Sequence, residues 1–102
     1  MLELRPNCEG CDIDLPVDAT NAYICTYECT FCKDCVERLL KNVCPNCGGG
    51  FTPRPVRPAT SRRNGVGLAF QPASTTRVKS KYSEEDIRAF SRLHQHIPPQ
   101  DR

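Results

Sequence analysis

The array Cys8-x2-Cys11-x13-Cys25-x3-Cys29-x2-Cys32-x2-Cys35-x8-Cys44-x2-Cys47 holds all eight cysteines of the 102-residue chain. Four thiolates around one ion complete the tetrahedral shell of structural zinc, and such a shell leaves no open position for catalysis. Eight ligands spaced in pairs therefore predict two closed sites, each holding one Zn²⁺. A region this short rarely folds on a hydrophobic core alone, so we expect the two ions to supply much of its folding free energy.

Disulfide bonds are the other common use of eight cysteines, and they require an oxidising compartment. Residues 1–7 contain no apolar run of signal-peptide length, and no later segment approaches a membrane span. We therefore expect a cytoplasmic protein with reduced cysteines and no membrane partner.

The way in which the cysteine pairs share ions depends on the segment between the last two pairs. Residues 36–43 place apolar side chains at helical spacing, which predicts a two-turn amphipathic helix with Asp34 as its cap. A rise of about 1.5 Å per residue would then separate Cys35 from Cys44 by roughly 12 Å. Four thiolates on one zinc lie within about 4 Å of one another, so one ion would not hold both pairs.

This geometry favours a crossed arrangement, in which alternate pairs share an ion. The sequential alternative, in which neighbouring pairs share one, would make residues 32–47 a zinc ribbon. Gly10 and Gly48 fit both arrangements, because glycine tolerates the positive φ of a turn that directs its amides toward sulfur. In the crossed arrangement site one is Cys8, Cys11, Cys32 and Cys35, and site two is Cys25, Cys29, Cys44 and Cys47.

Composition divides the chain into three parts. Residues 1–52 form the predicted zinc-binding domain, in which the strand formers of residues 22–27 indicate a short β-hairpin. Residues 53–82 begin with three closely spaced prolines and continue with small and polar side chains, which favours a disordered linker. Residues 83–98 predict an amphipathic helix, capped by Ser83 and ended by prolines. Its apolar face would either dock on the zinc-binding domain or bind a partner, through Ile87, Phe90 and Leu93.

Charge is distributed unevenly along the chain. Residues 1–52 contain more acidic than basic side chains, whereas residues 53–82 contain basic side chains and no acidic ones. A flexible cationic segment can neutralise phosphates, so the linker is a candidate for weak nucleic-acid contact. The other interpretation is a solvated linker that its charge keeps soluble. The candidate contacts are Arg62, Arg63, Arg77, Lys79 and Lys81.

The residues around the cysteines resemble known proteins. The order of the pairs, Phe31 between Cys29 and Cys35, and the closing Cys44-Pro45-Asn46-Cys47 are similar to a RING finger. The resemblance is closer to a bacterial family catalogued as domain of unknown function 1272, over residues 1–58 and loosely over residues 72–78. It implies a bacterial cytosolic zinc protein without an established activity. The segments that carry it are Leu4-Arg5-Pro6-Asn7-Cys8, Ile24-Cys25-Thr26-Tyr27-Glu28-Cys29-Thr30-Phe31-Cys32, Cys44-Pro45-Asn46-Cys47-Gly48-Gly49 and Pro72-Ala73-Ser74-Thr75-Thr76-Arg77-Val78.

The expected architecture is a small metal-stabilised α+β fold. It consists of a RING-like cross-brace of two four-cysteine zinc sites with a β-hairpin and one helix. A flexible basic linker and a short C-terminal helix follow.

These features predict a non-enzymatic module that binds another protein and has no small-molecule substrate. The array offers no nucleophile beside a base, and closed four-thiolate sites hold no activated water. Nucleic-acid contact is the alternative function. Ubiquitin-ligase-like activity is less favoured, because Glu9-Gly10 stands where ligase RINGs place a large apolar residue and the chain has no tryptophan. Redox or metal sensing would be a secondary role.

Overall fold

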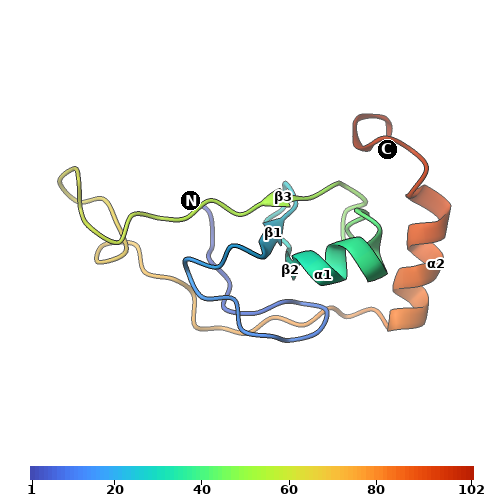
Figure 1. The fold of residues 1–102 in the computed structure, drawn as a ribbon, viewed down its shortest axis with the longest axis horizontal. Helices are drawn as coiled ribbons and strands as arrows, with labels where there is room; N and C mark the ends of the chain where they lie inside the picture. The colour runs from blue at the N-terminus through green and yellow to red at the C-terminus, as the bar shows by residue number, and fades with distance from the viewer.

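A small antiparallel sheet lies at the centre of the computed structural model, which describes residues 1–102 (Figure 1). Strand β1 (Ala22–Ile24) pairs with β2 (Thr30–Cys32), so that Tyr23 lies opposite Phe31. This is the predicted hairpin. A third strand, β3 (Thr52–Pro53), pairs with the other edge of β1 and gives the order β2-β1-β3.

The helix after β2 begins earlier than the sequence predicts. Helix α1 (Lys33–Cys35) continues directly into the π-helical turn η1 (Val36–Leu40). The expected cap, Asp34, lies inside the first turn, and the Cys32 sulfur caps the helix by accepting the N–H of Cys35 at 3.4 Å. The helical segment, residues 33–40, therefore lies nearer the N-terminus than the predicted residues 36–43. The reason is that a cysteine sulfur can take the place of a capping oxygen.

Two consecutive left-handed residues end this helix. Lys41 has φ 51° and Asn42 has φ 61°, a region that few residues other than glycine adopt and in which asparagine is enriched. The Asn42 side-chain oxygen accepts the N–H of Phe51 at 2.9 Å, which fixes the far side of the same loop. The conformation of the loop at residues 41–50, which carries Cys44 and Cys47, is thus fixed at both of its ends.

The hydrophobic core lies between the sheet, η1 and the C-terminal helix. The rings of Phe31 and Phe51 meet edge to face, with centroids 5.5 Å apart and planes at 81°. Leu15, Leu40 and Ile87 pack in the same cluster, together with most of the cysteines. A core this small is consistent with a fold that needs additional cross-links.

Helix α2 (Glu84–His94) docks on η1 with part of its apolar face (Figure 1). Ser83 caps it as predicted, because its hydroxyl accepts the N–H of Asp86 at 3.1 Å. Ser91 is buried and donates its hydroxyl to the carbonyl of Leu40 at 3.0 Å. The helix ends before the predicted residue 98, and the 3-10 turn η2 (Pro99–Asp101) follows. None of the helices combines the length and apolarity that a membrane span requires.

Residues 53–82 contain no helix or strand beyond Pro53, but they lie against the rest of the molecule. The Arg54 side chain is buried and donates to the carbonyls of Arg5 at 2.8 Å and Pro16 at 3.1 Å. The loop at residues 58–71 projects at the left of Figure 1. The chain then returns past the N-terminal segment, where Ser74 donates its N–H to the carbonyl of Leu4 at 3.0 Å. These contacts were not predicted from the sequence, and the flexibility of the segment stays a prediction.

Candidate metal centre

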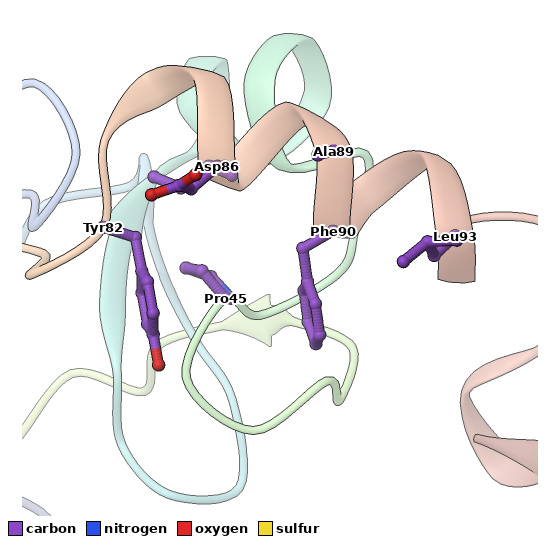
Figure 2. A pocket seen from close by; sticks show the side chains of 7 residues that line it. Pro45, Tyr82, Asp86, Ala89, Phe90 and Leu93 are labelled. Carbon is purple, nitrogen blue, oxygen red and sulfur yellow. The ribbon is translucent and has the colours of Figure 1, made fainter.

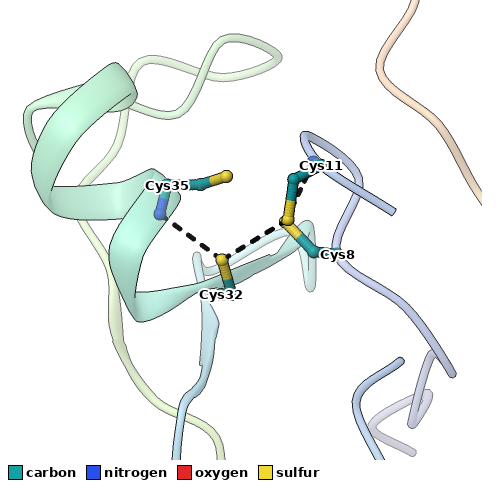
Figure 3. A group of neighbouring side chains, drawn as sticks. All are labelled: Cys8, Cys11, Cys32 and Cys35. Atoms are coloured by element: carbon teal, nitrogen blue, oxygen red, sulfur yellow. Dashed lines mark hydrogen bonds between the residues drawn. The ribbon is translucent and has the colours of Figure 1, made fainter. Parts of the chain in front are cut away.

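Four cysteine sulfurs form the first cluster, all within 4.8 Å of one another (Figure 3). Two come from the turn at residues 8–11, one from the end of β2 and one from the end of α1. The sulfurs of Cys11 and Cys32 lie 3.7 Å apart. This membership, Cys8, Cys11, Cys32 and Cys35, is the one that the crossed arrangement predicts.

The second cluster joins the hairpin turn to the loop after η1. The sulfurs of Cys25, Cys44 and Cys47 lie within 4.8 Å of one another. Cys29, the fourth predicted ligand, is not within this distance of all three, but it lies close enough to affect the pKa values of Cys25 and Cys44. The two pairs on either side of η1 belong to different clusters, so the sequential ribbon is not the arrangement of this fold.

Backbone amides point at the sulfurs in both clusters. The N–H groups of Gly10 and Cys11 donate to the Cys8 sulfur at 3.3 Å and 3.5 Å. In the second cluster the N–H of Gly49 donates to the Cys47 sulfur at 3.4 Å. Hydrogen bonds to sulfur favour the thiolate over the thiol, and the thiolate is the form that binds metal.

The glycines of the two turns have different roles. Gly48 has φ +80°, the positive value expected in a metal-binding turn. The same expectation is wrong for Gly10, which is not among the residues with positive φ. A Cβ at position 10 would instead lie 3.2 Å from the Cys35 sulfur and 3.4 Å from the Phe31 ring. Gly10 is therefore required for space beside the first cluster, and the left-handed residue of this turn is Asp12, with φ 66°.

Within each cluster, neighbouring thiols shift one another's pKa values in opposite directions. Hydrogen bonding from the Cys35 thiol lowers the pKa of Cys8 to about 4, and the same pairing raises the pKa of Cys35. Likewise, hydrogen bonds from Cys29 and then Cys44 lower the pKa of Cys25 to about 4, while the pKa of Cys44 is raised. Sulfurs this close share protons because they cannot all be ionised together. A cation that replaces those protons would allow four thiolates, so both clusters fit a metal ion.

The family assignment follows from the part of the chain that builds these clusters. The family model described as protein of unknown function (DUF1272) matches residues 1–57, which include every cysteine. The chain belongs to the DUF1272 family. A protein of Rhizobium meliloti (strain 1021), described as uncharacterized, is 58% identical to this DUF1272 chain over 78 residues. That match covers 76% of this chain and 86% of the relative. No solved structure matches.

The predicted partner-binding residues of α2 separate into two environments. Ile87 is only 4% exposed and belongs to the core, and it also lines the floor of a surface groove, so its part in binding a partner stays a prediction. Phe90 and Leu93 line a surface groove of about 340 Å³. Figure 2 shows the Tyr82 and Phe90 rings on either side of Pro45. The groove is also lined by Asp86, Ile87 and Ala89.

The predicted nucleic-acid residues do not form one surface. Arg77 pairs with Asp12 at 3.0 Å and with Asp14 at 2.7 Å, and this contact holds the pKa of Asp12 below its usual value. Lys79 lies 3.6 Å from Asp12, and the Lys81 ammonium lies 5.3 Å from the centre of the Tyr82 ring. The remaining two, Arg62 and Arg63, are exposed on the projecting loop and form no ion pair.

Two polar residues with a structural role were not predicted. Glu9 is 4% exposed, and its carboxylate accepts hydrogen bonds from the N–H of Thr30 and the guanidinium of Arg5. Burial raises its pKa despite these partners. Arg54 is the other buried charge, and burial lowers its pKa. Glu9 stands out in the sequence only as a departure from the ligase pattern, and Arg54 carries no signal beyond its proline-rich surroundings.

Proposed function

We propose that this DUF1272 protein is a zinc-binding, RING-like module that acts without catalysis by binding a short segment of another protein. The observation that carries the proposal is the groove between α2 and the turn at residues 44–47. Pro45, one wall of this groove, is held between two cysteines of the second cluster. Metal binding would therefore organise the binding surface as well as the fold.

The donor sets support zinc as the metal. Thiolates are soft ligands, and four of them in a tetrahedral arrangement select zinc over the hard cations that prefer oxygen. Such a site has no open position, so it stabilises the fold and does not activate water. A reducing compartment such as the cytoplasm suits this function, because cysteines that bind zinc must stay reduced.

Charge near the groove indicates which segment would bind there. Asp86 lines the groove, and the neighbouring Glu85 takes part in no ion pair. Four thiolates around a divalent ion add a formal charge of about −2 behind Pro45. We therefore propose an occupant with an aromatic or aliphatic anchor flanked by lysine or arginine. The anchor would contact Leu93, which is 66% exposed.

A peptide-display selection on the zinc-loaded full-length chain tests this function. We expect the enriched peptides to combine an apolar residue with flanking basic residues. Leu93→Ser should weaken binding of a selected peptide by tenfold or more, as burial of a large apolar side chain predicts. Arg92→Ser is the matched control, because Arg92 is the next residue and does not line the groove. Selection of acidic peptides, or equal binding by both variants, would contradict the proposal.

Nucleic-acid contact is the second candidate function, and the observation that favours it is the exposed pair Arg62 and Arg63 on the projecting loop. Two cations can neutralise only about two phosphates, so affinity would be low and would fall with salt. The test is fluorescence anisotropy with a labelled single-stranded oligonucleotide. Binding that persists in the Arg62→Ser, Arg63→Ser double variant would exclude this surface.

A further inference from the structure

The chain beyond the family match returns to both metal clusters. We call residues 74–80 the first strap and residues 97–102 the second strap. The first strap lies along the turn at residues 8–11, which provides two ligands of the first cluster. The second strap lies against the loop at residues 41–50, which provides two ligands of the second cluster.

Hydrogen bonds and ion pairs hold the first strap on both sides of the 8–11 turn. The Asn7 side-chain amide donates to the carbonyl of Val78 at 2.8 Å and accepts its N–H at 3.1 Å. The N–H of Ser80 donates to the carbonyl of Glu9 at 2.8 Å. On the far side, Arg77 donates to the backbone carbonyl and the carboxylate of Asp12.

One guanidinium holds the second strap. Arg102 donates through Nη1 to the carbonyls of Asn42 at 2.7 Å and Gly48 at 3.2 Å. Its Nε donates to the carbonyl of Ile97 at 2.9 Å, and this hydrogen bond joins the two ends of the second strap. Next to it, Pro99 packs so closely on Gly50 that a Cβ there would lie 3.1 Å from the proline ring.

We propose that each strap retains one metal ion, so that loss of a strap contact accelerates release from its own cluster and leaves the other unchanged. Release of an ion from a closed four-thiolate site requires a ligand-bearing turn to open locally. The strap contacts must break when that turn opens, so they slow its opening. The contacts of the two straps reach different ligand-bearing segments, which makes the effects separable. This inference concerns metal retention and does not depend on the proposed partner.

The experiment uses the full-length chain loaded with ¹¹³Cd²⁺, whose two bound ions give separate resonances. Each resonance is assigned through its coupling to the β-protons of its own cysteines. Intensities are then followed after addition of excess EDTA. Arg77→Ala tests the first strap, and Arg102→Ala tests the second. Arg62→Ala and Arg92→Ala are matched controls, because neither side chain contacts a strap or a ligand-bearing turn in any hydrogen bond or ion pair.

We expect Arg102→Ala to accelerate loss of the second resonance on the order of tenfold, as the loss of charge-assisted hydrogen bonds predicts. Arg77→Ala should do the same for the first resonance, and the controls should match the unmodified chain. Arg102→Lys keeps the charge and one nitrogen for the carbonyls of Asn42 and Gly48 but lacks the Nε donor to Ile97, so its effect should be smaller than that of Arg102→Ala. Full intensity of both resonances before EDTA shows that each variant is folded and loaded. Equal acceleration at both sites, or none at either, would overturn the proposal.

Discussion

Glu9 and Thr30 are joined twice, once through the side chain and once through the backbone. The buried carboxylate of Glu9 accepts the N–H of Thr30, and the N–H of Glu9 donates to the carbonyl of Thr30 at 2.9 Å. Thr30 begins β2, the strand that ends at Cys32. This pair therefore links the two segments that carry the ligands of the first cluster.

Replacing Glu9 by alanine should destabilise the metal-loaded protein by about 1–3 kcal/mol, because the buried N–H of Thr30 loses its acceptor. Glu9→Gln should cost less. It keeps an acceptor oxygen, and burial already raises the pKa of Glu9 and disfavours its charge. Urea denaturation at fixed metal concentration measures both variants. Equal stability of the alanine variant and the unmodified chain would refute this role.

Gly10→Ala should weaken the first cluster selectively, because the added methyl would lie 3.2 Å from the Cys35 sulfur. Crowding of this kind costs about 1–3 kcal/mol in packed interiors. Competition with a chromogenic chelator would show one weakened site and one unchanged site. Gly49→Ala is the comparison near the second cluster. Its added methyl would lie 3.4 Å from the Cys47 sulfur, which is less crowded than the contact at position 10.

Removal of the metal should unfold residues 1–52. Structural zinc contributes roughly 10–16 kcal/mol in small zinc-binding peptides, which exceeds the stability of most small domains. We expect dialysis against EDTA to abolish the near-ultraviolet circular dichroism and a stoichiometric return of zinc to restore it. Metal analysis by mass spectrometry should give two ions per chain. A single ion, or a folded metal-free chain, would contradict the two-site structure.

Arg54→Lys should destabilise the protein nearly as much as Arg54→Ala. The Arg54 guanidinium is 5% exposed and donates to three backbone carbonyls, those of Arg5, Leu15 and Pro16. A lysine ammonium carries the charge but cannot present donors across that span. Thermal unfolding should show a loss of about 2–4 kcal/mol for both substitutions. Arg63→Lys, on the exposed loop, should leave the melting temperature unchanged.

Short sequence patterns correctly predicted the features that depend on residues close together in the chain. The cysteine spacing and one helical segment were enough to place Cys35 and Cys44 in different clusters, and Ser83 was correctly identified as a helix cap. The start of the first helix was misplaced because no propensity accounts for a cap made by the sulfur of Cys32.

Contacts between distant irregular segments could not be predicted in this way. Asn7 and Val78 are 71 positions apart, and neither lies in a helix or strand whose period would show a buried face. The basic, proline-rich composition around Arg54 is that of a solvated chain, yet its charge is satisfied by carbonyls of the N-terminal segment. Burial of Ile87 but not Leu93 likewise depends on where η1 lies, which the sequence of α2 alone does not encode.

The ligands of the two clusters alternate along the chain, so a single contiguous segment of the sequence cannot encode one cluster without including ligands of the other. Any single cut between Cys8 and Cys47 divides the ligands of at least one cluster, so no fragment ending inside this region carries both sites intact. Neither site can be deleted, exchanged or duplicated as a contiguous cassette. On the ribosome, the ligands of the first cluster are complete once Cys35 emerges, whereas the second must wait for Cys47. Synthesis therefore completes the first set of ligands before the second.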